Sequence, residues 1–161
     1  MPAAFPRRVY TVNEVEKART IIASGHKHRL TIKGSDEFRK RATKTVEHVK
    51  TAGFYDFLRT YIRRIIEIDG FSQLRETEAA IWANTQLLES PIEAAGFFVQ
   101  KAFQMKEFVE GKLYYGGKAE ARSVEKRIEF LKALQARSDS PTVKQECARR
   151  LKRWADSTFV F

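Results

Sequence analysis

Helix start and stop signals divide this chain into short segments, and they constrain its fold more than hydropathy does. Ser and Asn can cap the first turn of a helix, and Gly can end the last one. Asn13 forms a capping-box pattern with Glu16, and Gly25 follows where that helix would end. These residues predict a first helix over about residues 14–24.

Beyond Gly34 the same signals predict a chain that is helical throughout. Ser90 followed by Pro91 is the strongest of them, because Pro is favoured at the first position of a helix. The further predicted helices cover about residues 35–52, 54–70, 72–88, 91–111 and 118–137, with a last one that begins at residues 140–141.

Two short segments flank the first predicted helix, and both alternate apolar with polar residues. They cover residues 8–12 and 29–33, and each contains the β-branched residues that half-buried strands favour. Two strands joined by one helix predict a small βαβ unit with parallel strands. Because a two-stranded sheet is only marginally stable alone, this unit must pack on the helices that follow.

Together these elements predict an α+β fold, predominantly helical, in a single domain of residues 1–161. A two-stranded βαβ element over residues 7–34 packs on a bundle of five to six helices over residues 35–161. The length is close to the commonest domain size of about 100–150 residues. An alternative stays open: residues 139–151 look like the second helix of a HEAT-type repeat, which would make the helical part a solenoid.

The most regular apolar pattern lies between residues 54 and 66. Its members recur at the spacing of one helix face: Phe54, Phe57, Leu58, Tyr61, Ile62, Ile65 and Ile66. The pattern predicts a core helix with Phe57 at the middle of its buried face. On this basis Phe57→Ala is expected to cost about 3–5 kcal/mol of stability.

The net charge of +10 is confined to the two ends of the chain. Residues 1–50 hold twelve Lys or Arg against five Asp or Glu, and residues 112–161 hold twelve against six. Residues 51–111 hold six against nine. A field of this sign attracts polyanions such as nucleic acid, without indicating which one.

Composition narrows the class of protein further. Apolar residues make up 43% of the chain and twelve are Phe, whereas disordered basic proteins are poor in aromatic residues. The single Cys147 excludes an internal disulfide, and no apolar run resembles a leader or a membrane span. We expect a cytoplasmic protein with no membrane span.

Two basic segments are the candidate polyanion-binding surfaces. One begins beside the second predicted strand, and the other lies on the last helix. A single polyanion bound by both would require them to share one continuous surface. The candidate residues are His26, Lys27, His28, Arg29, Lys33, Arg39, Lys40, Arg41 and Lys44 in the first segment and Arg149, Arg150 and Arg153 in the second.

Signatures of chemistry are absent from the sequence. There is no phosphate-binding loop, dinucleotide fingerprint, nucleophile elbow or paired zinc-ligand spacing, so no catalytic residue, metal or cofactor is expected. An enzyme would have to use His26, His28 and His48. The acidic residues of the middle third read as helix-surface charges.

The sequence therefore favours a non-enzymatic binding module for nucleic acid or another polyanion, which acts through basic N- and C-terminal surfaces. The alternative is a protein interaction or assembly module, in which the acidic middle meets a basic surface of a protein partner or of another copy of the chain.

Overall fold

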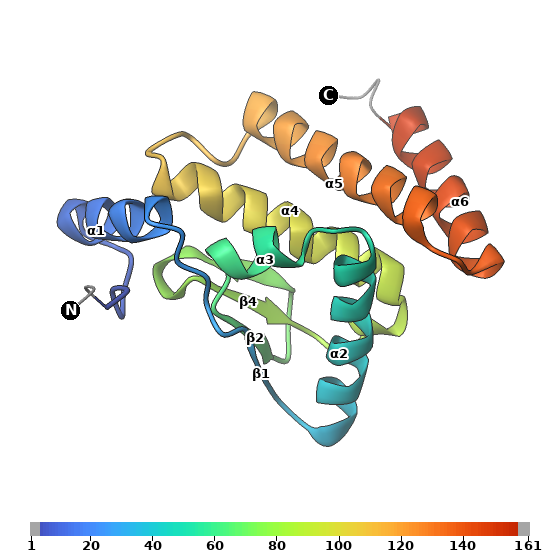
Figure 1. Ribbon diagram of the computed structural model, residues 1–161, viewed down its shortest axis with the longest axis horizontal. Helices are drawn as coiled ribbons and strands as arrows, with labels where there is room; N and C mark the ends of the chain where they lie inside the picture. The colour runs from blue at the N-terminus through green and yellow to red at the C-terminus, as the bar shows by residue number, and fades with distance from the viewer. Residues whose placement is uncertain (1–3, 158–161) are drawn as a thin grey trace.

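The computed structural model describes residues 4–157, and within them a small mixed sheet packs against a layer of helices (Figure 1). The helices are α1 (Val12–Ala23), α2 (Asp36–Thr51), α3 (Tyr55–Tyr61), α4 (Pro91–Val109), α5 (Gly117–Arg137) and α6 (Pro141–Ser157). The strands are β1 (Thr31–Lys33), β2 (Arg64–Glu67), β3 (Gln73–Arg75) and β4 (Ala80–Ala83). The predicted α+β class with mostly helical content is confirmed.

The sheet has four strands in the order β1-β2-β4-β3, so the predicted two-stranded sheet is wrong. β1, β2 and β4 are parallel, and β3 pairs with β4 in the antiparallel sense. A βαβ crossover is present, but it runs from β1 through α2 and α3 to β2 rather than through α1. Residues 8–12 are no strand, although the Val9 amide donates to the Thr77 carbonyl at 2.8 Å.

The predicted helix over residues 54–70 is wrong in its second half. α3 ends at Tyr61, and Ile62 has an extended backbone that leads into β2. The Arg63 amide donates to the Ala79 carbonyl at 2.7 Å, which starts the pairing with the β4 side of the sheet. Short apolar runs rich in Ile fit a strand as well as a helix, and here sheet pairing decides between them.

The predicted helix over residues 72–88 is replaced by the hairpin of β3 and β4. A short 3-10 turn (Glu76–Glu78) joins the two strands, and Ala79 takes a left-handed backbone with φ of 51°. A second 3-10 turn (Leu87–Glu89) leads into α4. Alternating side chains, not helical spacing, therefore describe this segment.

Other predicted helices are confirmed with small changes of boundary. α1 begins two residues earlier than expected, because Thr11 and Glu14, rather than Asn13 and Glu16, form the capping box. Ser35 caps α2 as predicted by accepting from the Phe38 amide. Pro91 begins α4 as predicted, although the Ser90 side chain makes no capping bond.

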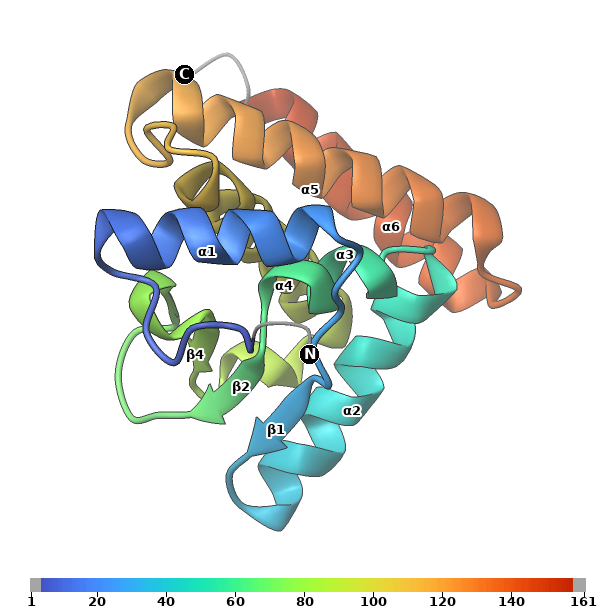
Figure 2. The ribbon, with the colours of Figure 1, turned by 60° about the vertical axis from the view of Figure 1, so that its left-hand side comes forward.

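One core joins the sheet to the helices, and α4 lies at its centre. Ile32, Ile65, Ile81 and Leu74 form one row across the sheet, on the face that α2 and α4 cover (Figures 1 and 2). Because the sheet and α2 both pack on α4, the helices do not form a solenoid of like pairs. No helix within residues 4–157 has the length and apolar character needed to cross a bilayer.

A buried polar network joins the last three helices. The Arg127 guanidinium donates to the Gln100 side chain at 2.9 Å and pairs with Glu93. Arg150 pairs with both Glu93 and Glu146. Since these groups sit between α4, α5 and α6, they fix how the three helices pack.

Candidate nucleic-acid interface

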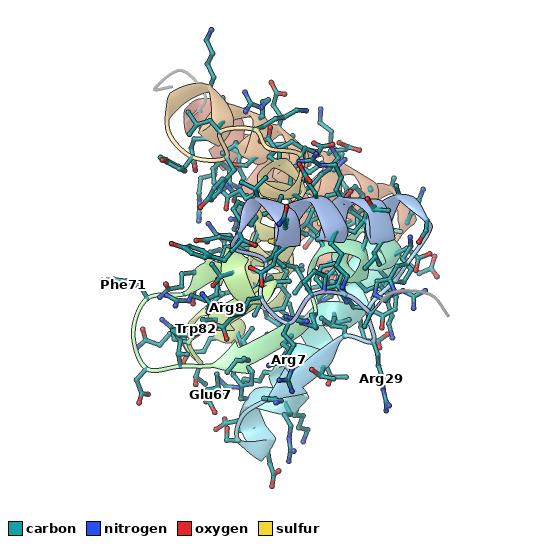
Figure 3. All side chains as sticks on the ribbon, turned by 90° about the vertical axis from the view of Figure 1, so that its left-hand side faces the viewer. Arg7, Arg8, Arg29, Glu67, Phe71 and Trp82 are labelled. Carbon is teal, nitrogen blue, oxygen red and sulfur yellow. The ribbon has the colours of Figure 1, made fainter. Side chains whose placement is uncertain are left out.

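No helix within residues 4–157 covers the second face of the sheet. Strand side chains alternate between the two faces, so the register partners of the buried isoleucine row identify the opposite, open face. Figure 3 faces this side of the sheet. Its residues, which we call the open face, are Thr31, Lys33, Arg64, Ile66, Gln73, Arg75, Ala80 and Trp82.

Three of these eight side chains are basic and none is acidic. Lys33 is exposed and Arg64 is half-buried, and neither forms an ion pair within residues 4–157. Arg75 has one acidic neighbour, Glu78, at 3.6 Å from Nε. A positive, largely unpaired surface of this kind is what contact with a phosphate backbone requires.

An aromatic ring lies in the middle of the open face. The Arg75 guanidinium stacks over the Trp82 indole, 4.2 Å from the ring centroid. The Trp82 Nε1 group is buried and has no hydrogen-bond acceptor in the described part of the chain. This cation–π contact holds the Arg75 guanidinium over the ring, and a guanidinium is itself a planar group on which a base can stack.

Further cations border the open face. Arg7 and Arg8 lie on the N-terminal segment in front of the sheet, and Arg29 lies at the opposite edge from Phe71 (Figure 3). Arg63 fixes the N-terminal segment by donating to the carbonyl groups of Pro6 at 3.1 Å and Arg7 at 2.9 Å. All three bordering arginines are exposed.

The sequence-predicted residues of the first basic segment separate into two groups. Lys27, Arg29, Lys33, Lys40 and Lys44 are exposed and make no ion pair within the described range. Arg39 instead pairs with Asp36, and Arg41 pairs with Glu37 at 2.7 Å. Both pairs lie within α2, next to its N-terminus.

His28 does not present a charge to solvent. It is 5% exposed and packs edge-on against Phe5 and His26, whose Nε2 lies 3.3 Å from His28 Nδ1. Burial, helped by the charges of His26 and Arg63, lowers the pKa of His28 to about 4. His28 is therefore neutral at physiological pH and supports the packing of the N-terminal segment.

The basic residues of α6 lie far from the open face. α6 packs on α5, on the side of the molecule away from the sheet (Figures 1 and 2). Arg153 is exposed, whereas Arg149 pairs with Glu146 and Arg150 is only 9% exposed within the buried network. The structure does not bring the two predicted basic segments onto one surface.

Sequence reasoning missed Arg64, Arg75 and Trp82 as candidate site residues. It assigned all three to helices, Arg64 to the predicted helix over residues 54–70 and Arg75 and Trp82 to the one over residues 72–88. Neither Arg64-Ile65-Ile66-Glu67 nor Ala80-Ile81-Trp82-Ala83 alternates polar with apolar residues, so no local signal in the sequence could have found them.

The structure offers little for catalysis. No group of three or more His, Cys, Asp or Glu side chains within residues 4–157 has metal-binding geometry. His48 is half-buried on α2, and burial next to Lys44 lowers its pKa. It makes no hydrogen bond to a carboxylate in the described range that would orient it as a base.

No family model, no curated protein and no solved structure matches this chain.

Proposed function

We propose that this chain is a non-enzymatic module that binds single-stranded nucleic acid across the open face of its sheet. The observation that carries the proposal is the Arg75–Trp82 stack, which lies among unpaired cations on a sheet face without a helix over it. The proposal keeps the nucleic-acid function expected from the sequence. It moves the site from the two chain ends to the sheet and its N-terminal border.

Charge supplies the affinity in this proposal. The open face contributes Lys33, Arg64 and Arg75, and the border contributes Arg7, Arg8 and Arg29. Each phosphate that these cations neutralise releases counterions, so log K falls by about 0.7 per phosphate for a single strand as log salt rises. Six cations give a slope of at most about 4.

Stacking favours a single strand over a duplex. Bases in a duplex are already stacked on one another, whereas bases of a single strand can stack on aromatic rings and on Arg guanidinium planes. The guanidinium of Arg75 provides such a plane. Each stacked base is worth about 1–3 kcal/mol.

The test is a binding titration with a labelled single strand of mixed sequence, followed by fluorescence anisotropy at two salt concentrations. The variant Lys33→Ala with Arg64→Ala and Arg75→Ala is expected to bind at least tenfold more weakly. Its matched control is Lys144→Ala with Arg149→Ala and Arg153→Ala, which removes the same number of cations from α6. Heparin and a duplex of the same length test whether any polyanion suffices.

The two triple variants separate the outcomes. Equal losses in both would mean that only net charge matters, which would contradict a site on the sheet. If the parent chain does not bind the single strand even at low salt, the proposed nucleic-acid function is wrong. Thermal melting of both variants shows whether either loses affinity through unfolding.

A second candidate function is self-assembly, which a separate observation favours. Exposed large apolar side chains, Tyr10, Val12, Leu113 and Tyr115, occur near the start of α1 and the end of α4. Tyr10 and Val12 line one shallow pocket there together with Phe108. Light scattering tests this function: Val12→Ser with Leu113→Ser would convert a dimer into a monomer, and a monomeric parent chain would exclude it.

A further inference from the structure

A pocket lies at the carboxyl ends of β2 and β4, next to the open face. It encloses about 480 Å³ and is lined by Ile68, Asp69, Gly70, Phe71, Asn84, Thr85 and Gln86. This volume falls within the range of about 300–1,000 Å³ that small-molecule sites occupy. The carboxyl ends of parallel strands are also where sheets of this kind most often bind ligands.

Asn84 holds the two walls of the pocket together. Its Nδ2 donates to the Gly70 carbonyl at 2.7 Å, and its Oδ1 accepts from the Leu87 amide at 3.0 Å. Its own amide donates to Ser72 Oγ at 2.9 Å. Gly70 has φ of 130°, a conformation that a residue with a Cβ rarely adopts, so this turn depends on glycine. Hydrogen bonds and backbone conformation therefore fix the walls of the pocket.

Three side chains of the pocket remain free to meet a ligand. Asp69 and Gln86 are exposed, and the side chain of neither makes a hydrogen bond or ion pair with another described residue. Phe71 is 90% exposed. No Lys or Arg lines the pocket, so its chemistry suits a planar group with N–H donors rather than a phosphate.

The pocket continues the open face. Ile68 and Asn84 follow Ile66 and Trp82 at the two-residue spacing of a strand, and the Ile68 amide donates to the Ala83 carbonyl at 3.0 Å. Figure 3 shows Phe71 at the edge of the face, beyond Trp82. A nucleic-acid strand that crosses Arg75 and Trp82 on the open face therefore reaches the pocket.

We propose that this pocket receives one unstacked base of the bound strand and prefers guanine, an inference that rests on the proposed function. Guanine presents two adjacent donors, N1–H and the N2 amino group, to the two oxygens of the Asp69 carboxylate. Adenine, cytosine and uracil each present an acceptor beside their donor, which the carboxylate repels. Gln86 can donate to guanine O6, and Phe71 supplies a ring for stacking.

The test compares oligouridylate with the same oligonucleotide carrying one central guanine, adenine or inosine. Good bidentate pairing discriminates between bases by roughly 5- to 150-fold. Guanine is expected to tighten binding at least fivefold over uracil and adenine. Inosine, which lacks the N2 amino group, is expected to lose most of that gain.

Asp69→Asn is expected to abolish the guanine preference. Because this variant also removes a negative charge, it strengthens binding of every oligonucleotide, and the readout is the ratio of the guanine to the uracil affinity. Asp139→Asn, an exposed site between α5 and α6, is the control and should keep the parent ratio. Asp69→Asn with an unchanged ratio would overturn the assignment to Asp69.

The outcomes separate this inference from the function on which it rests. If oligouridylate binds and all four oligonucleotides bind equally, the base pocket is wrong while the proposed function stands. If no oligonucleotide binds at low salt, both are wrong.

Discussion

Arg75 and Trp82 are diagonal neighbours on the two strands of the β3–β4 hairpin, with the guanidinium 4.2 Å from the centroid of the indole ring. Both lie on the face of the sheet that no helix within residues 4–157 covers. A guanidinium held over an aromatic ring keeps its charge and its planar shape together. This pair accounts for both terms of the proposed binding, the electrostatic one and the stacking one.

Arg75→Lys tests the stacking term without changing the charge. Lys is a point charge on a flexible stem and offers no plane on which a base can stack. We expect affinity for a single strand to fall by about 1–3 kcal/mol while the salt dependence of binding stays the same. Titrations at two salt concentrations measure both quantities. An affinity equal to that of the parent chain would show that Arg75 acts only as a charge.

Phe130 and Phe57 differ in burial, so substituting each by Ala tests the packing of the core. Phe130 is fully buried, whereas Phe57 is half-buried at the edge of an aromatic group with Phe54 and Tyr61. Phe130→Ala is expected to lower the free energy of unfolding by about 3–5 kcal/mol. Phe57→Ala is now expected to lower the free energy of unfolding by less than this, because a half-buried ring contributes less buried apolar surface that its removal can take away. Urea unfolding of both variants checks this, and a larger loss for Phe57→Ala would contradict the packing described.

Gly96 on α4 should tolerate no larger residue. A Cβ at this position would lie 2.9 Å from Nε and 3.2 Å from Cγ of Arg127, which the buried network holds in place. Gly96→Ala is therefore expected to destabilise by about 1–3 kcal/mol, although Ala is the better helix former.

Gly117→Ala is the matched control for that substitution. A Cβ at Gly117 in the first turn of α5 would have no neighbour within 4 Å. This variant is expected to stabilise by about 0.4–1 kcal/mol, because it restricts the unfolded chain. Thermal melting distinguishes the two variants: Gly96→Ala is expected to lower the melting temperature and Gly117→Ala to raise it.

His28 should make the fold sensitive to mild acid. Its pKa is about 4 in the folded chain, mainly because it is buried, and about 6.5 when unfolded. The unfolded chain therefore binds the proton more tightly than the folded chain does. The contribution of the neutral His28 ring to stability is thus complete above about pH 6.5 and is lost as the pH falls toward 4. The loss at pH 4 is roughly 3 kcal/mol.

Urea midpoints of the parent chain and of His28→Gln, taken at pH 7 and near pH 4.5, check this prediction. The parent chain should lose more stability between the two pH values than the variant does. Burial lowers the pKa of His48 as well, so the parent chain and His28→Gln are both compared with His48→Gln added to each. Equal losses would show that His28 is not buried as a neutral ring.

The sequence predicted the helices that carry their own local signals and missed those elements that depend on distant partners. Ser35 and Pro91 mark α2 and α4 correctly, because capping acts within one turn. Nothing local distinguishes Arg64–Glu67 or Ala80–Ala83 from helix, since their strand state depends on pairing with each other and with β1.

The same limit explains what was predicted of the site. Lys33 and Arg29 were recognised from charge alone, and both lie on or beside the open face. Trp82 and Arg75 could not be recognised, because they become neighbours only when the hairpin forms. Arg150 was taken for a surface cation, since sequence cannot show that Glu93 lies opposite it in the folded chain. The cytoplasmic location stays a prediction.

The two tryptophans of the chain can report separately where a single strand binds, because Trp82 lies on the open face and Trp154 lies on α6. Each can be observed alone, in Trp154→Phe and in Trp82→Phe respectively, while a single-stranded oligonucleotide is added. We expect saturable quenching of Trp82 fluorescence that salt reverses, and an unchanged signal from Trp154. Quenching of Trp154 with an unchanged Trp82 signal would place the binding site on α6 and contradict a site on the sheet.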